Sequence, residues 1–317
     1  MTSALFFFSY YWMLVLDVQL SPCLAGLKAH NGRILKPFQS KQRGERECEF
    51  YERVFATEKD LLEFAALRKF LPMYHGTVIV PEVEDGQEVN GVHPGQYLVL
   101  EDLTWGRKWP CIMDVKMGTR SYEDNATAEK IAYEKSKFPL QETLGFRIQG
   151  IKVYNPKKQD YDEFDKYFGR GITSVDQLAP AFRSYFPEDT SKTIKLLETV
   201  GLVNSQLPEI LTLFFFYYLL LSIQFLRRLG QLKAWFDEQR GTEFIASSFL
   251  FLYDGEDSPN DDKTVAEDFG ADIRLIDFAH VTKPTSPKRD EGLRTGIATL
   301  INCFQTLLRE AQTQQDR

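Results

Sequence analysis

The sequence predicts an α+β protein with two lobes, a small antiparallel β-rich N-terminal lobe and a larger α+β C-terminal lobe. Short β-rich segments and turns dominate the beginning of the 317-residue chain, and long apolar-striped helices dominate its end. A strand ending at Glu101-Asp102-Leu103 separates the two parts and indicates a hinge. The hydrophobic share of 43% is sufficient for a sizeable core.

The N-terminal lobe is expected to begin with a β-hairpin. Asn31-Gly32 supplies the positive φ values of a tight turn in the middle of Leu27–Lys36. Helices and strands follow from the spacing of apolar residues and from β-branched content. The predicted helices are Glu45–Phe55 and Asp60–Phe70, and the predicted strands are Gly76–Val80 and Gln96–Leu100.

The C-terminal lobe is expected to alternate strands with helices. The predicted helices are Tyr122–Lys137, Val175–Phe186, Thr193–Gln239 and Thr295–Ala311. The predicted strands are Leu144–Tyr154, Phe244–Tyr253 and Asp272–Phe278, and Gly255–Asp268 reads as an acidic loop. This divides the chain into an atypical apolar N-terminus (1–23), an N-lobe (24–103) and a C-lobe (104–317).

The charge of the chain limits its partners. A net charge of −7 and a pI of about 5.3 oppose binding to nucleic acid, and an anionic ligand needs a local basic pocket. The four cysteines lie far apart without a C-x-x-C pair, which argues against zinc and disulfides and indicates a reducing compartment. We expect no nucleic-acid partner.

Two apolar runs, Ala4–Leu20 and Leu211–Leu221, stand out from this composition. The first lacks the basic start of a signal peptide, and the second is shorter than the ~20 residues that a bilayer requires. We therefore expect no stable membrane insertion. Both runs are rich in residues with pyrimidine-rich codons, and Gln19 and Gln224 lie near their ends, as in the translated end of an intron.

The helical pattern supports an insertion at the second run. Removing Gly201–Gln224 joins Ile194 and Leu197 to a later apolar series with spacings of 3, 4, 4, 3 and 4, which is one helix face. That series is Phe225, Leu229, Leu232 and Phe236. We hypothesise that Gly201–Gln224 is a retained intron or a late insertion, and that residues 1–23 are a second artefact of the gene model.

The segment Pro110–Gly118 carries the strongest chemical signal. Asp114 and Lys116 lie two residues apart, so on an extended segment both side chains point to the same side. A carboxylate and an ammonium on one face can align a hydroxyl and neutralise a phosphoryl group in transfer. Because the surrounding run is apolar, these charges are expected to be partly buried, which requires a reason.

The stretch PCIMDVKMG resembles the P-x-x-x-D-x-K-x-G signature of the inositol polyphosphate kinase family. Five further motifs resemble the family in order, from about Leu24 to Leu308. They are EFYERV at 49–54, LVLEDL at 98–103, LGFRIQGIKVY at 144–154, SSFLFLYDG at 247–255 and IDFAHV at 276–281. The resemblance implies a two-lobed, protein-kinase-like fold and transfer of phosphate from ATP to an inositol phosphate, with Asp114 and Lys116 catalytic.

The resemblance also implies a nucleotide site and a metal site. Lys36 corresponds to the lysine that holds the ATP phosphates, and Glu47 to the helix glutamate near it. The hinge residues Glu101, Asp102 and Leu103 correspond to those that meet adenine and ribose. Asp277 corresponds to a Mg²⁺ ligand, and Ser248 to the serine near the metal, with Ser247 left open as an alternative.

The acceptor site is expected to be basic. Lys130 and Lys137 are seven residues apart and share a helix face, and they match the substrate helix of the family. Arg120 and His280 complete the expected acceptor contacts, while Arg147 and Lys152 add positive charge in the following strand. A satisfied core histidine is an equal interpretation of His280.

Within the family, the short interval Thr119–Thr143 between the signature and LGFR disfavours a dedicated trisphosphate 3-kinase. The chain resembles the multikinases most, at the SKFPL-x-E-x-LGF stretch and at the tail DEGLRTGI. A hexakisphosphate kinase and an inactive inositol-phosphate-binding scaffold stay open as alternatives. A Walker loop is absent from the sequence, as are the HRD-type loop and the DFG triplet of protein kinases. We expect a monomer that acts on inositol polyphosphates in the cytoplasm, the nucleus or both.

Overall fold

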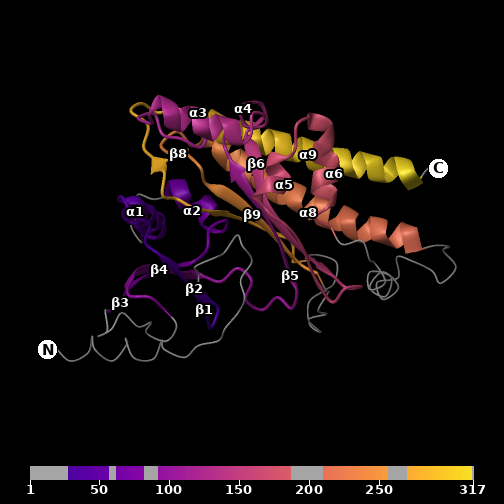
Figure 1. Cartoon of the computed structure of the whole chain (residues 1–317), viewed down its shortest axis with the longest axis horizontal. Helices are drawn as coiled ribbons and strands as arrows, with labels where there is room; N and C mark the ends of the chain where they lie inside the picture. The colour runs from indigo at the N-terminus through magenta and orange to yellow at the C-terminus, as the bar shows by residue number, and fades with distance from the viewer. Residues whose placement is uncertain (1–27, 57–61, 82–91, 187–209, 256–269, 316–317) are drawn as a thin grey trace. The chain divides into compact units, whose positions relative to one another are not determined.

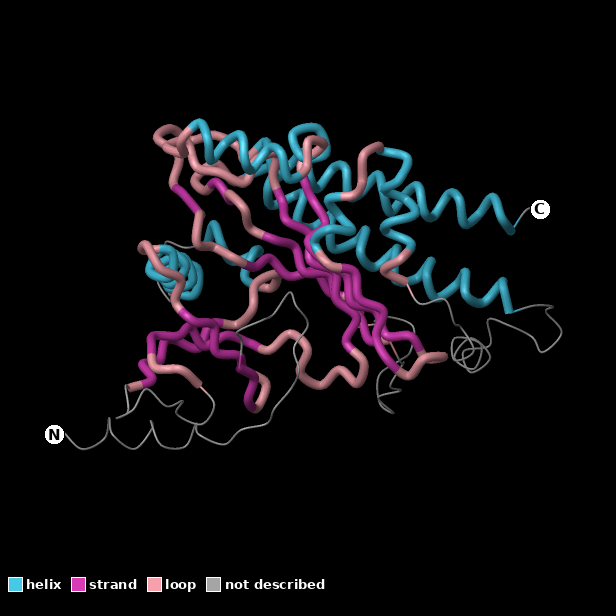
Figure 2. Tube along the Cα trace, in the orientation of Figure 1, coloured by secondary structure: helices cyan, strands magenta, loops and turns pink. Residues whose placement is uncertain are grey.

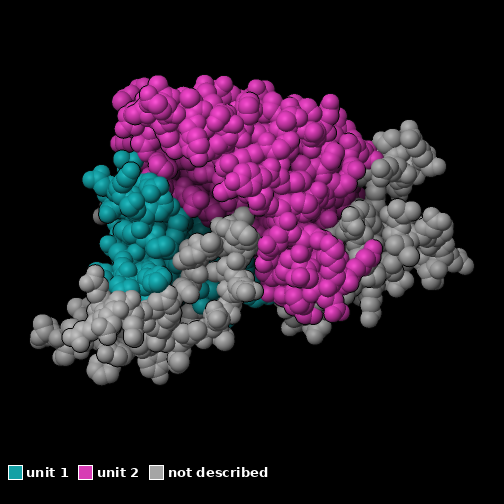
Figure 3. All heavy atoms as spheres, in the orientation of Figure 1, with its two compact units in different colours: residues 1–106 teal, residues 107–317 magenta. Residues whose placement is uncertain are grey.

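A computed structural model describes residues 28–56, 62–81, 92–186, 210–255 and 270–315 of the chain (Figure 1). The chain divides into two compact units, residues 1–106 and 107–317, which Figure 3 shows in different colours. Each unit has its own antiparallel sheet with helices, so the predicted α+β class is confirmed. The first apolar run, Ala4–Leu20, lies outside the described residues.

Unit 1 is built on a four-stranded antiparallel sheet of order β1-β2-β4-β3. The predicted hairpin is confirmed, because Asn31 (φ 47°) and Gly32 (φ 75°) form the turn between its first two strands. The strands are β1 (Lys28–His30), β2 (Arg33–Pro37), β3 (Tyr74–Val80) and β4 (Gly95–Glu101).

Two helices complete unit 1, α1 (Arg43–Phe55) and α2 (Leu62–Arg68). Helix α1 buries Phe50, Tyr51 and Val54 on one face, at the i, i+1, i+4 spacing of an amphipathic helix. The Tyr51 ring stacks on Tyr74 of β3 with 5.5 Å between centroids, which fixes this helix on the sheet.

Unit 2 is built on a five-stranded antiparallel sheet of order β10-β9-β5-β6-β7, drawn in magenta in Figure 2. The segment that carries the sequence signature is the central strand β5, paired on both sides. The strands are β5 (Pro110–Met117), β6 (Phe146–Asn155), β7 (Asp160–Phe164), β9 (Ser248–Asp254) and β10 (Asp272–Ile276). The signature is therefore held in the middle of the sheet.

One face of this sheet is covered by the two long helices, α8 (Ile210–Glu238) and α9 (Glu291–Gln315), which lie side by side in Figure 1. Phe225 of α8, Phe251 of β9 and Phe304 of α9 meet there, with ring centroids 5.3 to 5.7 Å apart. All three are fully buried, so they form the centre of the core.

Helix α9 crosses the end of β5 at a contact between two glycines. A Cβ atom on Gly145 would lie 2.3 Å from the Gly296 nitrogen, and a Cβ on Gly296 would lie 2.2 Å from the Gly145 oxygen. Gly145 also needs its positive φ of 71° to end a short helix. Its carbonyl accepts a 2.7 Å bond from the Gly118 N–H, where the signature ends.

Short elements surround the sheet of unit 2. They are α3 (Ala128–Lys137), α4 (Gln141–Leu144), α5 (Lys166–Arg170), η3 (Val175–Gln177), α6 (Leu178–Arg183), β8 (Glu243–Phe244) and β11 (Val281–Thr282). The predicted helix at Tyr122–Lys137 was wrong in its first turns. Thr127 caps α3 by accepting a bond from the Lys130 N–H, so the helix begins at Ala128.

Two other boundaries differ from the prediction for local reasons. The predicted strand Phe244–Tyr253 is split into β8 and β9, because Ala246 has a φ of 56° that extended pairing does not allow. The last helix begins four residues before Thr295, because Asp290 caps it through a 2.9 Å bond from the Leu293 N–H.

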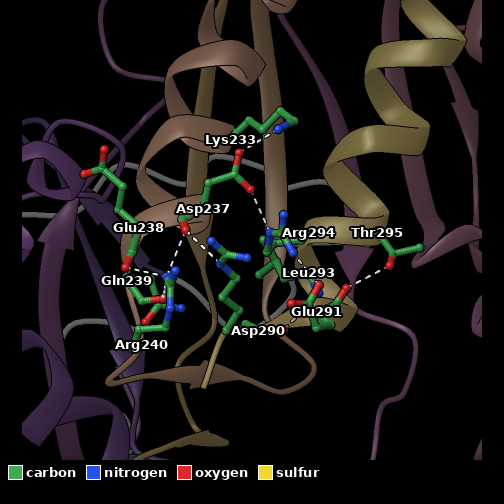
Figure 4. Close-up of polar contacts among 11 residues, drawn as sticks. Lys233, Asp237, Glu238, Gln239, Arg240, Asp290, Glu291, Leu293, Arg294 and Thr295 are labelled. Carbon is green, nitrogen blue, oxygen red and sulfur yellow. Dashed lines mark hydrogen bonds and ion pairs between the residues drawn. The ribbon is translucent and has the colours of Figure 1, made fainter. Parts of the chain in front are cut away.

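A polar network joins the end of α8 to the start of α9 (Figure 4). The Asp237 carboxylate accepts bonds from Lys233 (2.6 Å) and Arg294 (2.7 Å), and these cations hold the pKa of Asp237 below its usual value. Arg240 donates to the last carbonyls of α8, those of residues 237 to 239. The network therefore caps one helix while it orients the next.

Helix α8 includes part of the hypothesised insertion, Gly201–Gln224. The predicted series Phe225, Leu229, Leu232 and Phe236 is fully buried. Ile194 and Leu197 lie outside the described residues. The segment holds 24 residues (201 to 224 inclusive), so deletion would move Ile194 to the place of Tyr218 and Leu197 to that of Leu221. Tyr218 and Leu221 are 6% and 0% exposed.

The segment fits the core incompletely. Ser222 Oγ and Gln224 Oε1 are buried and have no hydrogen-bond partner among the described residues. Each such orphaned group costs about 1–3 kcal/mol of stability. This mismatch agrees with the hypothesis of a late insertion or retained intron.

In the described part of the chain, no helix combines the length and the hydropathy that crossing a membrane requires.

Deletion of Gly201–Gln224 is expected to preserve the fold and to be more stable than a deletion that breaks the register, because the 24-residue shift keeps the apolar series on one helix face. Val200 would replace the orphaned Gln224, while Glu198 would replace Ser222, so these two changes oppose each other. Thermal unfolding measures the change. A matched control deletes Gly201–Ile223 instead, which removes one residue fewer and turns the apolar series by about 100° around the helix. Loss of the fold in the 24-residue deletion, or equal thermal stability of the two deletions, would contradict the hypothesis.

Candidate functional site

In unit 1, the structure brings together two residues that the sequence predicts to act on a nucleotide. The Lys36 ammonium on β2 donates a 2.8 Å bond to the Glu47 carboxylate on α1. Glu47 is 1% exposed and Lys36 is 14% exposed, so the pair is shielded from water on the carboxylate side. A glutamate held in this way fixes the direction of a lysine that binds a phosphate.

The predicted hinge residues lie at the end of β4, with Glu101 as its last residue. The Glu101 carboxylate accepts a 3.0 Å bond from the Met73 N–H, and Asp102 Oδ1 accepts bonds from the backbone and hydroxyl of Thr104 (2.9 and 2.6 Å). Leu103 lies between these residues and is partly buried. Both carboxylates therefore stabilise the backbone around the end of β4 through their own hydrogen bonds.

In unit 2, Asp114 and Lys116 point to the face of the sheet opposite α8 and α9. Met113, Val115 and Met117 alternate with them and are fully buried. Ser248 of β9 pairs with Lys116 in register and with Ile276, the residue before Asp277. The register thus gathers Asp114, Lys116, Ser248 and Asp277 from three adjacent strands.

Two atoms in this cluster lack well-aligned protein partners. Asp114 Oδ1 and Ser248 Oγ are buried, and neither has a partner at full hydrogen-bond geometry among the described residues, although the two side chains are close enough for Ser248 to lower the pKa of Asp114. The neighbouring Ser247 differs, because its hydroxyl donates a 2.8 Å bond to the Asp277 carbonyl. Orphaned buried oxygens are uncommon in folded proteins and indicate a ligand that completes them. The structure therefore separates the two serines, Ser247 as a structural residue and Ser248 as the candidate ligand.

The cluster is electrostatically perturbed. Burial and the nearby Asp277 charge together raise the pKa of Asp114 to about 6, while the Ser248 hydroxyl and the charges of Lys116 and Arg147 oppose the shift. Burial also lowers the pKa of Lys116, against the charges of Asp277 and Asp114. The Lys116 ammonium donates a 3.2 Å bond to the Ala246 carbonyl. A carboxylate with a pKa near neutrality can accept a proton under ordinary conditions.

The backbone beside the cluster is strained. Asp277 and Ala246 have φ values of 66° and 56°, a left-handed region that non-glycine residues seldom adopt. Each such residue costs about 1 kcal/mol or more, and the Ser247–Asp277 hydrogen bond links the two strained segments. Strain of this kind persists where the surrounding structure holds a side chain in a required direction.

The oxygen atoms of this cluster fit a hard cation such as Mg²⁺. Asp277, Asp114 and Ser248 provide carboxylate and hydroxyl oxygens, two of them orphaned. Among the described residues, no group of three or more His, Cys, Asp and Glu side chains gathers as a full metal cage. Mg²⁺ is commonly bound by one or two carboxylates while other ligands complete its coordination, and Asp114 and Asp277 provide two carboxylates.

The four predicted acceptor residues all contact carboxylates. Arg120 pairs with Glu243 at 2.9 Å and with Asp124, and His280 Nδ1 lies 2.7 Å from Glu123. Lys130 and Lys137 share one helix face, as the sequence predicts. Both of these lysines bind Glu134 of the same helix. Arg120 and Glu134 also line a cavity of about 330 Å³ beside α3 and α4.

Sequence reasoning assigned no role to Glu134, and it gave Arg147 only a general contribution to the positive charge of the acceptor site. Arg147 is 2% exposed, and its Nη1 atom has no hydrogen-bond partner among the described residues. It pairs in register with Lys116 because a β-bulge between Asp114 and Val115 shifts the register of β6. Strict alternation would place Arg147 on the other face. The sequence offers no signal for that bulge beyond the short stretch around Gly150.

Comparisons with known proteins agree with this geometry. The family model described as inositol polyphosphate kinase matches residues 97–305. An inositol polyphosphate multikinase of Rattus norvegicus is 34% identical over 249 residues, 77% of this chain and 54% of the relative. The Homo sapiens multikinase is 33% identical over 257 residues, 80% and 53% of the two chains. The chain thus spans about half the length of these relatives.

A solved structure is similar throughout its length. It is an inositol phosphate multikinase, Ipk2 of S. cerevisiae, in complex with ADP and Mn²⁺. The match has a TM-score of 0.60 and 25% identity, and covers 88% of this chain and 100% of that one. The two-lobed, kinase-like fold expected from the sequence is therefore confirmed.

The two serines are expected to respond oppositely to substitution. Ser247→Ala removes the hydrogen bond to the Asp277 carbonyl and should lower the free energy of unfolding by about 1 kcal/mol. Ser248→Ala removes an orphaned hydroxyl and should leave stability unchanged or raise it. Denaturant unfolding without metal or nucleotide compares them. Equal losses for both variants would show that Ser248 Oγ has a structural partner.

The pKa of Asp114 predicts a pH-dependent stability. The folded pKa of about 6 exceeds the ordinary aspartate value of 3.8, so ionisation of Asp114 destabilises the fold as pH rises from about 4 to 6. Asp114→Asn stays neutral and should escape this loss. Its stability advantage over the unsubstituted protein should grow across that window and be constant above it, measured by thermal unfolding without metal. An advantage independent of pH would contradict the raised pKa.

Proposed function

Because the chain belongs to the inositol polyphosphate kinase family, we propose that it transfers the γ-phosphate of ATP to hydroxyl groups of inositol polyphosphates. The orphaned Asp114 Oδ1 beside Lys116, Ser248 and Asp277 carries this proposal. The breadth of substrates would resemble that of a multikinase, converting tris- and tetrakisphosphates to higher phosphates. Two observations support this breadth: the similarity of the chain to multikinases and the short interval from Thr119 to Thr143.

The roles of Asp114 and Lys116 follow from their positions. Asp114 would accept a hydrogen bond from the attacking hydroxyl through its orphaned oxygen and take its proton, which a pKa of about 6 allows. Lys116 would offset negative charge that develops on the transferred phosphoryl group. Their shared face directs both side chains to the same reacting group.

The nucleotide and the cation would be held by other residues. Lys36, oriented by Glu47, would bind phosphates of ATP, and the Glu101–Leu103 connection would bind adenine and ribose. Asp277 and Ser248 would hold Mg²⁺. When bound, Mg²⁺ would neutralise charge on the nucleotide phosphates. The backbone strain at Asp277 would keep its carboxylate directed to the ion.

The acceptor would be bound by basic residues of unit 2. Lys130 and Lys137 on α3 would bind phosphate groups as charge-assisted hydrogen-bond donors. Arg120 and His280 would add contacts, each oriented by a carboxylate partner. In a chain of net charge −7, this gathering of cations would confine anion binding to one region.

We also propose that the protein is a monomer of the cytoplasm, the nucleus or both. Cys48, Cys111 and Cys303 are unpaired, as expected in a reducing compartment, and this supports the proposal. Size-exclusion chromatography tests the oligomeric state, and microscopy of a tagged chain tests the compartment. A disulfide-linked or secreted protein would contradict them.

Turnover with purified protein tests the function. Mg-ATP is supplied with inositol trisphosphate, tetrakisphosphates or hexakisphosphate, and product positions are resolved. Asp114→Asn should lower kcat about 10²–10⁴-fold with the fold preserved by circular dichroism. Near-normal turnover in that variant would refute the role of Asp114. Pyrophosphate products would identify a hexakisphosphate kinase, and binding without turnover would identify a scaffold.

A further inference from the structure

Glu134 occupies an unusual position on the helix that carries the acceptor lysines. It lies four residues after Lys130 and three before Lys137, so the three side chains share one face of α3. The Lys137 ammonium donates a 2.8 Å bond to Glu134 Oε1, and Lys130 bonds to the same oxygen. One carboxylate oxygen therefore receives both of the ammonium groups assigned to acceptor phosphates.

The direction of the Glu134 side chain separates this cluster from an ordinary surface ion pair. Glu134 is 7% exposed, whereas Lys130 is 52% exposed and Lys137 is 17% exposed. On a solvated helix face both members of a pair are expected to be exposed. Here the carboxylate points inward and the lysines reach over it. Lys137 also lies 4.2 Å from the Tyr133 ring centroid, which restricts its position further.

Glu134 also acts on the cations of the central strands. Burial and the nearby Arg170 lower the pKa of Arg147, and the charges of Glu134 and Asp114 oppose that shift. Burial lowers the pKa of Lys116 as well, and Glu134 is among the carboxylates that oppose it. The carboxylate is thus near four cations, Lys116, Lys130, Lys137 and Arg147. This is the kind of environment that binds a phosphate group.

We infer that Glu134 is a specificity-determining residue, which occupies an anion position among Lys130, Lys137 and Arg147 and so disfavours acceptors that carry more phosphate groups. The inference rests on the proposed function, because it concerns the acceptor of that same reaction. A phosphate bound by Lys130 or Lys137 lies near the Glu134 carboxylate, because both ammonium groups bond to it. Each further phosphate that the acceptor brings into this region adds to the repulsion, so the penalty is smallest for the acceptor with the fewest phosphates.

The size of the effect follows from Coulomb's law. At separations of about 6 Å and an intermediate effective dielectric, removal of one negative charge strengthens binding of a nearby phosphate by about tenfold. Glu134→Gln keeps the shape and removes the charge. Affinity for inositol hexakisphosphate should therefore rise by about tenfold or more, and affinity for inositol trisphosphate should rise less. Because ions screen exposed charges, the gain should shrink at high salt.

Isothermal titration calorimetry measures these affinities without requiring turnover. The full chain is titrated with inositol tris-, tetrakis- and hexakisphosphate at low and high salt. Glu129→Gln is the matched control, since it removes the same charge from an exposed position on α3. That control should leave the ratio of affinities for hexakis- and trisphosphate unchanged. Glu134→Asp keeps the charge, so it should retain the low affinity for hexakisphosphate even if the shorter side chain alters stability.

An unchanged ratio of affinities in Glu134→Gln would overturn the inference, as would an equal rise in Glu129→Gln or Glu134→Asp. If the Glu134→Gln protein does not fold, the Glu134→Asp protein still tests the inference. It keeps the negative charge, so it must still bind hexakisphosphate weakly. If the unsubstituted protein shows no turnover while Glu134→Gln still binds hexakisphosphate more tightly, the proposed function fails and the role of Glu134 stands.

Discussion

The central strand β5 determines how the rest of unit 2 is arranged. Its alternation places Met113, Val115 and Met117 under α8 and α9 and leaves Asp114 and Lys116 on the opposite face. Apolar burial on one side therefore fixes the positions of the charges on the other. A slip of one residue would exchange the two faces, so the core that stabilises the sheet also secures the register of the reactive pair.

The site is where the molecule tolerates unfavourable local features. Asp114 and Ser248 carry orphaned buried oxygens, and Asp277 and Ala246 have backbone conformations that side chains disfavour. Some buried groups elsewhere are satisfied, as in Asp237 with its two cations and Asp290 at the start of α9, and others are orphaned, as in Ser222 and Gln224. Unfavourable features gathered in one place are expected where a ligand supplies the missing contacts. The aromatic core around Phe225, Phe251 and Phe304 offsets their cost.

Much of this arrangement could be predicted from sequence because local chemistry determines it. The Asn31-Gly32 turn, the buried series of α8 and the shared face of Lys130 and Lys137 all follow from period and turn residues. What could not be predicted depends on tertiary context. The bulge that brings Arg147 beside Lys116 leaves no mark in the pattern, and neither does the inward direction of Glu134. The roles assigned to the nucleotide, metal and acceptor residues stay predictions.

The contact between Gly145 and Gly296 links segments that are far apart in sequence, the end of the signature region and the last helix. In evolutionary terms, neither position can acquire a side chain independently, since either methyl group would strike the other backbone. The last helix would have to move away as a body, and the Gly145 carbonyl that holds Gly118 would move with it. A side chain at Gly296, 178 positions after Gly118, would therefore disturb the backbone that ends the signature.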